Sequence, residues 1–320
     1  MAKVAITGIS GFVGSNVAAV LSGFGHEVVG LVRTNRSDLP WPSRVVDFDS
    51  VVSLTEATRN CDAVVHCAIA NDFNRLTQDR EYAYDSYVGM TARVAKASVA
   101  NGAHLVYVST DWIMDGTQHM SLESNAGNPL NLYGFLKAMS EQVCRDLAED
   151  SHAICRIAGV MGRHQAAENN PRSQDVGFGY FVDTLVRTLK EDKPFAVWGP
   201  DFVNKVTTPS LATEIGAQIE RVISRRAVGN FHLVGDDAVT RLELAYATCD
   251  VFELDPSLIH ESPVPESEKF AAPVPVDSSL SNLETKRRLG LGTTSLVDLL
   301  RAFRREIETG EVQTLTKPEA

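Results

Sequence analysis

A tyrosine and a lysine four residues apart, Tyr133 and Lys137, form the pair in this sequence that is best suited to proton transfer. In a helix, a spacing of four residues places both side chains on the same face. A positively charged lysine nearby lowers the pKa of a tyrosine, which can then exchange a proton with a carbonyl or hydroxyl group. The pair therefore predicts general acid–base chemistry.

Three glycines near the start of the chain, Gly8, Gly11 and Gly14, predict a site for a dinucleotide cofactor. They follow a short apolar run and open a segment with helical spacing, which is the context in which such a loop binds a diphosphate. The first glycine permits a tight turn, the second lets the backbone approach the diphosphate, and the third lets helix and strand pack closely. The N–H groups at the start of the helix add donors and a partial positive charge. We expect the cofactor to contact Gly8, Ser10, Gly11, Phe12, Val13 and Gly14.

The residues after the second apolar run distinguish between the two nicotinamide dinucleotides. An acidic residue there binds the ribose 2′-hydroxyl of NAD. This chain instead has Arg33 and Arg36, whose guanidinium groups can pair with a 2′-phosphate. They predict NADP as the cofactor, although two arginines at such a position are also typical of a solvated surface.

The elements that must position these residues alternate between strand-like and helical patterns over residues 1–160. We expect strands at 3–7, 27–32, 63–67 and 105–109, and helices at 13–23 and 91–100. This alternation predicts right-handed βαβ units and a parallel sheet that is covered on both faces. The predicted fold class is α/β, a Rossmann-type doubly wound parallel sheet that binds the dinucleotide.

Residues 161–312 predict a smaller C-terminal lobe that binds the substrate and is interleaved with the Rossmann domain, to which later segments return. We expect residues 313–320 to form a frayed tail, because chain ends are poorly ordered unless something holds them. Helical patterns cover 178–190, 213–224, 241–251 and 296–307, and a proline-rich connection covers 263–275.

Composition and charge argue against several classes of protein. The formal net charge is −11, which does not favour binding to nucleic acid or to an anionic membrane. The five cysteines have no CxxC spacing, which argues against a disulfide framework and a zinc site, and no paired ligand motif predicts another metal. There is no run of about 20 apolar residues and no signal-peptide pattern, so we expect a cytoplasmic protein without a membrane span.

Two motifs resemble the extended short-chain dehydrogenase/reductase family: the GxxGxxG spacing of residues 8–14 and the YxxxK spacing of residues 133–137. The resemblance implies that Tyr133 is the proton donor, that Lys137 hydrogen-bonds the nicotinamide ribose and that Thr110 orients the substrate oxygen. It thereby implies a catalytic triad that works with NADPH and needs no metal.

Other positions extend the resemblance to the cofactor site. Asp47 and Phe48 match the family's acidic–apolar pair beside the adenine, and an asparagine common in extended members appears here as Ser86. The segment after residue 66 matches the strand end that lies against the cofactor. The cofactor contacts implied in this way are Asp47, Phe48, Cys67, Ala68, Ile69, Ser86 and Ile157.

Within this family the chain is most similar to the dTDP-4-dehydrorhamnose reductases. Residues 109–116 (STDWIMDG) resemble their STDYVFDG motif, and further matches lie at 229–233, 241–245, 279–282 and 289–290. The resemblance implies hydride transfer from NADPH to the keto carbon of a nucleotide-linked 4-keto-6-deoxy sugar. It also implies a homodimer, because members of the family associate through helices next to the active site.

The substrate is expected between the triad and the second lobe, because ligands bind at the carboxyl ends of parallel strands. Asp111 and Trp112 adjoin the triad threonine and are expected to shape the sugar pocket. Four other residues could hold the diphosphate and base, or could instead be loop surface and lobe core: Arg163, Arg172, Phe178 and Tyr180.

Three departures from the reductase pattern leave the sugar open: the segment 71–76, Ser86, and Ala272 where the family has an arginine. A 4,6-dehydratase needs an Asp–Glu pair after the threonine, whereas Trp112 follows Asp111 here. A sugar-nucleotide 4-epimerase with the same triad is an alternative. A non-catalytic NADP-binding regulatory subunit is another, because the β subunit of methionine adenosyltransferase resembles the same reductases.

Overall fold

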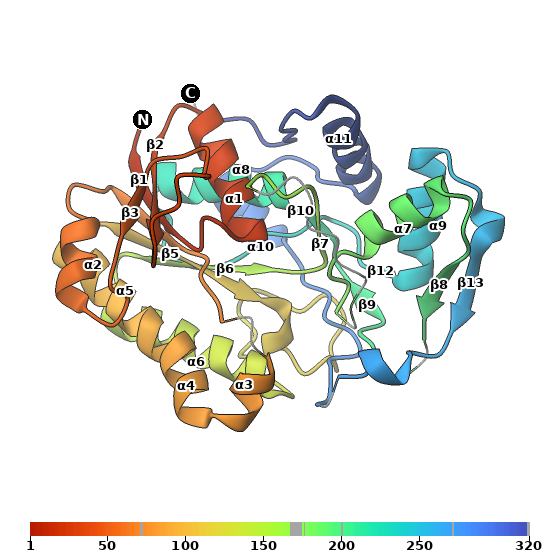
Figure 1. Cartoon of the computed structure of the whole chain (residues 1–320), viewed down its shortest axis with the longest axis horizontal. Coiled ribbons are helices and arrows are strands. Elements are labelled where there is room, and N and C mark those ends of the chain that lie inside the picture. Colours follow the sequence, from red (N-terminus) through yellow and green to blue (C-terminus); the bar gives the residue numbers. More distant parts are fainter. Residues whose placement is uncertain (71–72, 167–174, 176, 200, 271, 319–320) are drawn as a thin grey trace.

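The centre of the fold is a parallel sheet, shown in the computed structural model of Figure 1. The structure describes residues 1–70, 73–166, 175, 177–199, 201–270 and 272–318. In this part of the chain the main sheet has seven strands in the order β11-β6-β5-β4-β1-β2-β3, and all neighbours are parallel. The strands are β1 (Lys3–Thr7), β2 (Glu27–Val32), β3 (Ser43–Val45), β4 (Ala63–His66), β5 (His104–Thr110), β6 (His152–Ile157) and β11 (Gly229–His232).

Helices cover both faces of this sheet and bury apolar side chains against it (Figure 1). Val17 and Ile219 are fully buried on one face, and Leu54 and Cys144 on the other. The first face is covered by α1 (Phe12–Gly23), α8 (Ala212–Ser224) and α10 (Leu283–Leu289). The second is covered by α2 (Val51–Ala57), α5 (Met90–Ala100) and α6 (Leu132–Leu147). The predicted Rossmann-type doubly wound sheet is therefore confirmed.

The elements predicted from the first half of the sequence are confirmed, with ends that differ by at most one residue. The expected strands are β1, β2, β4 and β5, and the expected helices are α1 and α5. Their patterns are readable because strands in a covered parallel sheet are almost continuously apolar, as the fully buried β5 illustrates.

A second core lies beside the sheet, at the right of Figure 1. Leu185, Leu244 and Phe303 are fully buried at its centre. The elements around it are α7 (Phe181–Lys190), α9 (Arg241–Phe252), α11 (Leu296–Thr309) and the paired strands β8 (Phe195–Trp198) and β13 (Ile259–Ser262). The predicted helix at 178–190 starts only at Phe181, because Phe178 and Tyr180 have φ values of 65° and 55°, outside the helical region.

Two later segments return to the main sheet. Helix α8 packs against α1, and β11, which follows it, pairs with β6 as the outermost strand. The remaining elements are short: α3 (Phe73–Gln78), α4 (Arg80–Tyr84), a π-helical turn (Asp85–Gly89), β7 (Val160–Met161), β9 (Val206–Thr207), β10 (Ser210–Leu211), β12 (Val239–Thr240) and 3-10 turns at Asp111–Ile113, Pro256–Leu258 and Glu266–Glu268.

The end of the chain is held rather than frayed. The backbone N–H groups of Leu315 and Thr316 donate to the carboxylate of Glu214 on α8, and Thr316 is buried. The N–H of Gln313 donates to Glu306 on α11. The predicted fraying is therefore wrong for this segment, because buried carboxylates on two helices accept its backbone donors. Residues 319–320 lie outside the described part.

None of the helices described is long and apolar enough to cross a membrane.

Candidate active site

Two cavities lie at the carboxyl edge of the sheet and meet at Cys67 and Ile69, which line both. The larger, of ≈ 460 Å³, lies at the ends of β5 and β6 and the start of α6. The smaller, of ≈ 280 Å³, lies beside the glycine loop and the end of β2. This is the edge at which parallel α/β sheets bind ligands.

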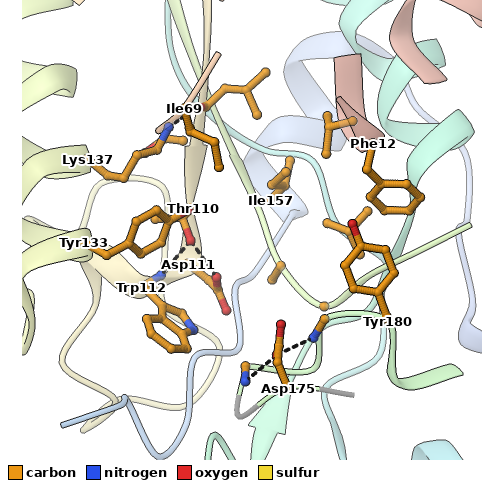
Figure 2. A pocket seen from close by; sticks show the side chains of 18 of the residues that line it. Phe12, Ile69, Thr110, Asp111, Trp112, Tyr133, Lys137, Ile157, Asp175 and Tyr180 are labelled. Atoms are coloured by element: carbon orange, nitrogen blue, oxygen red, sulfur yellow. Dashed lines mark hydrogen bonds between the residues drawn. The ribbon is translucent and has the colours of Figure 1, made fainter. Parts of the chain in front are cut away.

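The larger cavity brings Thr110, Tyr133 and Lys137 together on one wall. Thr110 is the last residue of β5, and the other two lie one turn apart on α6. In Figure 2 the ring of Tyr133 points toward Thr110, with Lys137 beside it. The spacing therefore places both α6 side chains on one face, as expected from the sequence.

The start of α6 is fixed by a cap and a glycine. The side chain of Asn131 accepts a hydrogen bond of 3.0 Å from the N–H of Gly134, which satisfies a free donor of the first turn. A Cβ atom on Gly134 would lie 2.1 Å from the backbone oxygen of Trp112, so only glycine allows this approach. Both features hold the first turn of α6, with Tyr133, against the segment that follows Thr110.

Thr110 is the centre of a hydrogen-bond network. Its hydroxyl donates to Oδ1 of Asp111 at 3.0 Å and accepts from the N–H of Trp112 at 3.2 Å. It is also hydrogen-bonded to Tyr133. Burial raises the pKa of Tyr133 to about 12, and the bond to Thr110 opposes this rise. Tyr133 therefore holds its proton at neutral pH, as a donor to a carbonyl oxygen must.

Lys137 is buried behind this network. Its Nζ donates to the backbone carbonyl of Val108 and lies 4.3 Å from the ring centre of Tyr107. Burial lowers the pKa of Lys137 to about 8. In the chain on its own, burial and the charge of Asp111 raise the pKa of Tyr133. That Lys137 lowers this pKa stays a prediction.

Asp111 and Trp112 line the same wall, where the sequence analysis placed them. Asp111 is only 5% exposed, and its carboxyl group also accepts a hydrogen bond from Ser278. Burial raises the pKa of Asp111 to about 7, although its hydrogen bonds oppose this rise. The ring of Trp112 stands edge-on to that of Tyr133, with centroids 6.0 Å apart.

The opposite wall is built by the loop before α7 (Figure 2). Tyr180 lines the cavity there, with its ring centroid 5.2 Å from that of Phe12. The carboxylate of Asp175 accepts the N–H of Gly177 at 2.7 Å, and a Cβ atom on Gly177 would lie 2.6 Å from the Trp112 ring. The loop thus runs from Tyr180, on the opposite wall, to Gly177, which packs against Trp112 on the first wall.

Acidic side chains outnumber basic ones among the described residues that line this cavity. Asp111, Asp175 and Glu268 are acidic, and Lys137 is the basic residue. Asp175, Glu268 and Phe270 were missed by the sequence analysis, since they lie in a polar loop and a proline-rich connection without a motif. Only the fold brings them to the ends of β5 and β6.

Of the four residues expected to hold the diphosphate and base, Tyr180 lines this cavity, whereas Arg163 and Phe178 do not. Arg163 donates to the backbone carbonyl of Glu306 at 2.9 Å and lines an adjoining cavity that it shares with Tyr180. Arg172 lies outside the described residues. Phe178 is 2% exposed and belongs to the second core, under the guanidinium of Arg241, which is the lobe-core alternative considered for it.

The smaller cavity fits the diphosphate of a dinucleotide. Gly8 has a φ of 69°, and a Cβ atom there would lie 2.8 Å from the backbone nitrogen of Ala68. A Cβ atom on Gly14 would lie 2.2 Å from the oxygen of Gly8, so α1 touches the turn that follows β1 at this point. Helix α1 has Gly11 as its N-cap, with no side-chain cap and no acid in the first turn. Its first N–H groups can therefore meet phosphate oxygens.

The two arginines after β2 both line the smaller cavity, but they differ in their contacts. Arg36 forms hydrogen bonds of 2.8 and 2.7 Å with Asp38. Arg33 is exposed and has no ion pair within the part of the chain that the structure describes. Arg33 is thus the arginine whose charge is not already matched by a carboxylate.

Most of the other expected cofactor contacts also line a cavity. The smaller cavity is lined by Gly8, Ser10, Gly11, Phe48, Cys67, Ala68 and Ile69, and the larger by Phe12, Val13, Cys67, Ile69 and Ile157. Three of the expected contacts line neither cavity: Gly14, Asp47 and Ser86. Asp47 is exposed and accepts from the N–H of Asp49, while buried Ser86 donates to the carbonyl of Ala83 in the turn before α5.

A buried ion pair lies behind Thr110, Tyr133 and Lys137. Glu141, one turn after Lys137 on α6, accepts from Ser109 of β5 at 2.6 Å and from two nitrogens of Arg156 on β6 at 3.0 and 2.9 Å. Glu141 and Arg156 are 2% and 1% exposed. The pair therefore ties α6 to both strands that carry the cavity wall.

The described residues contain no group of three or more His, Cys, Asp or Glu side chains arranged to hold a metal ion.

Comparison with known proteins identifies the family. The family model described as the RmlD substrate binding domain matches residues 2–307. A probable low-salt glycan biosynthesis reductase of Haloferax volcanii is 28% identical, over 93% of this chain and 96% of that protein. The dTDP-4-keto-6-deoxy-D-glucose reductase of Streptomyces niveus is 28% identical, over 83% of each. Methionine adenosyltransferase 2 subunit beta of Rattus norvegicus is 28% identical, over 72% of this chain and 65% of that protein.

Solved structures agree on the fold. The dTDP-4-dehydrorhamnose reductase of Bacillus anthracis, determined in complex with NADP, has a TM-score of 0.76 at 23% identity and covers 96% of this chain and 99% of its own. The resemblance to dTDP-4-dehydrorhamnose reductases and the prediction of an oxidoreductase of this type are confirmed. With a match that spans nearly its whole length, the chain belongs to the RmlD substrate binding domain family.

Proposed function

We propose that the chain is an NADPH-dependent ketoreductase that acts on a nucleotide-linked 4-keto-6-deoxy sugar. The observation that carries the proposal is the junction of two cavities at Cys67 and Ile69. One cavity holds Tyr133 and its network, and the other is lined by the glycine loop and Arg33. A hydride donor in the second cavity can thus reach a carbonyl carbon in the first.

The residues of the smaller cavity suit NADP. A bound nicotinamide dinucleotide would supply the hydride. The N–H groups of the glycine loop and of α1 hold its diphosphate, and Arg33 pairs with the 2′-phosphate that distinguishes NADP from NAD. Phe48 lines the same cavity and packs against the adenosine half.

The residues of the larger cavity carry out the proton chemistry. Tyr133 donates its proton to the carbonyl oxygen, which Thr110 orients, and such a donor contributes about 10²–10⁴-fold to the rate. Lys137 holds a ribose hydroxyl and offers its positive charge to the phenolate that remains. The raised pKa of Tyr133 favours this direction, because a phenol that binds its proton tightly is still protonated when the ketone arrives.

Two lines of support point to a sugar. The Streptomyces niveus relative is named for a dTDP-4-keto-6-deoxy sugar, and the Haloferax volcanii relative for glycan biosynthesis. The cavity wall offers aromatic faces, from Trp112 and Phe270, and carboxylates that accept hydroxyl groups, from Asp175 and Glu268. The proposed sugar pocket lies between these groups.

A non-catalytic NADP-binding regulatory subunit is the second candidate, and the similarity to methionine adenosyltransferase 2 subunit beta is the observation in its favour. The hydrogen bond between Tyr133 and Thr110 and the cavity in front of it favour catalysis instead. A 4-epimerase would use the same triad.

One experiment separates these functions. NADPH oxidation and sugar products are measured with a panel of dTDP- and UDP-linked 4-keto-6-deoxy sugars. A ketoreductase oxidises one NADPH for each alcohol formed, whereas an epimerase interconverts sugars without net oxidation. NADPH binding without turnover of any sugar in the panel would contradict the proposal and favour the regulatory subunit.

A further inference from the structure

A chain of hydrogen bonds leads from Tyr133 into the region between the two cores. Tyr133 is hydrogen-bonded to Thr110. The hydroxyl of Thr110 donates to Oδ1 of Asp111 at 3.0 Å (Figure 2). The other carboxyl oxygen of Asp111 accepts from the hydroxyl of Ser278, which in turn accepts from the side-chain amide of Asn204. The hydroxyl group of Thr110 thus links the carboxyl group of Asp111 to the phenol of Tyr133.

The surroundings of Asp111 favour a protonated carboxyl group. The side chain is 5% exposed, and within the described chain no lysine or arginine forms an ion pair with it. The remaining members of the hydrogen-bonded chain, Ser278 and Asn204, are 0% exposed and uncharged. Burial therefore dominates and raises the pKa of Asp111 to about 7, so that the group both holds and releases a proton near neutral pH.

Among the residues that the structure describes, the charged groups nearby do not neutralise this carboxyl group. On the cavity walls, Asp175 and Glu268 are acidic and Lys137 donates to another group. Beside Ser278 and Asn204, Asp277 and Arg241 have other hydrogen-bond partners. The charged groups concerned are Asp175, bonded to the N–H of Gly177; Glu268, on the cavity wall; Lys137, bonded to the carbonyl of Val108; Asp277, bonded to His119; and Arg241, bonded to the backbone carbonyl of Asn204.

We propose that Asp111 is a proton-relay residue that resupplies Tyr133, a role that rests on the proposed ketoreduction. Each reduction transfers the phenol proton of Tyr133 to the substrate oxygen and leaves a phenolate. Thr110 then passes its hydroxyl proton to the phenolate while it takes the carboxyl proton of Asp111. Tyr133 is again a phenol and Thr110 again a hydroxyl, and the Asp111 carboxylate takes a proton from solvent in the cavity that it lines.

The first test compares the first turnover with the steady state in Asp111→Asn. An amide keeps the size of the side chain but has no carboxyl proton to transfer. We expect the first NADPH per site to be oxidised about 10²-fold faster than the following ones, because Tyr133 starts with its own proton. The steady-state kcat should then fall by about 10²-fold. A residue that merely shapes the site would slow both phases equally, and that result would overturn the relay.

The second test uses the pH dependence of kcat. Because the relay needs the acid form of Asp111, the wild-type kcat should fall as pH rises through about 7, the pKa of this group. The step should be absent in Asp111→Asn and present in Asp111→Glu. In Ser278→Ala the carboxyl group loses a hydrogen bond that lowers its pKa, so the step should move to higher pH. A step that remains in Asp111→Asn would overturn the proposal.

The third test needs no substrate or cofactor. Ultraviolet absorbance follows tyrosinate formation at alkaline pH, and subtraction of the Tyr133→Phe signal isolates Tyr133. The charge of Asp111 raises the pKa of Tyr133, so Asp111→Asn should lower the midpoint. An unchanged midpoint would show that the two groups are not coupled and would overturn the relay. If the wild type shows no turnover, the proposed function itself is overturned. This outcome differs from a failure of the relay, because Asp111 is intact in the wild type.

Discussion

Burial sets the proton affinities of the residues around Thr110. It raises the pKa of Tyr133 to about 12, lowers that of Lys137 to about 8 and raises that of Asp111 to about 7. At neutral pH the phenol is therefore protonated, the ammonium largely so, and the carboxyl group divided between its two forms. Thr110 connects the donor to the carboxyl group, which gives a single threonine two tasks in the proposed reaction.

The choice between NADP and NAD is a prediction at the scale of one residue. Arg33→Asp places a negative charge beside the smaller cavity, in place of a guanidinium that has no ion pair among the described residues. We expect the affinity for NADPH to fall about ten- to a hundredfold, because a hydrogen bond to a charged group is lost, while NADH binding changes less. Fluorescence titration measures both.

Arg36→Ala is the matched comparison for this change. Its guanidinium is already paired with Asp38, so its removal should weaken NADPH binding less than the change at Arg33. Equal losses of NADPH and NADH affinity in Arg33→Asp would remove the basis for the choice of NADP.

Helix α6 is the element on which the site depends. Asn131 and Gly134 fix its start, and Glu141 anchors its middle to β5 and β6 through Ser109 and Arg156. A four-residue spacing in the sequence predicted that Tyr133 and Lys137 share a face, but it could not predict this anchor. Glu141 and Arg156 meet only because their helix and strand pack against each other.

The buried ion pair between Glu141 and Arg156 should contribute to the stability of the fold. Arg156→Met leaves the buried carboxylate of Glu141 without its main partner, so the free energy of unfolding should fall by about 3–5 kcal/mol. Arg145→Met removes the partly exposed partner of the same carboxylate and should cost less than about 1 kcal/mol. Urea denaturation compares the two, and similar losses in both variants would contradict the assignment of Arg156 as the main partner.

At the scale of the whole molecule, the larger cavity joins segments from both cores. Local periodicity was sufficient to predict β1, β2, β4 and β5, since each of them depends on its own residues. The contact between Asp111 and Ser278 joins positions 167 residues apart, and no local pattern encodes it. The same reason explains why Asp175 was missed and why the tail was expected to fray.

The docking of α11 onto α8 should make stability depend on pH. Glu306 on α11 is fully buried against Thr213 on α8, and burial raises its pKa from 4.5 to about 7. The folded state therefore binds more protons than the unfolded state in this window, so the free energy of unfolding should fall as pH rises from 4.5 to about 7.

Glu306→Gln removes the titrating group and tests this prediction. Relative to the variant, the wild type should lose on the order of 1–3 kcal/mol between pH 5 and 8. Denaturation at both pH values measures the difference, and Glu308→Gln, on an exposed position of the same helix, is the control. A difference between wild type and Glu306→Gln that does not change with pH would contradict the assignment.

The central claim is that Tyr133 donates the proton in a reduction driven by NADPH. Its most direct test is the rate of NADPH oxidation by wild type and Tyr133→Phe with a dTDP-linked 4-keto-6-deoxy sugar, together with the affinity of each protein for NADPH. Tyr84→Phe, an exposed tyrosine on α4, is the matched control. We predict that Tyr133→Phe loses about 10²–10⁴-fold in kcat while its affinity for NADPH is retained. Wild-type turnover by Tyr133→Phe would contradict the account.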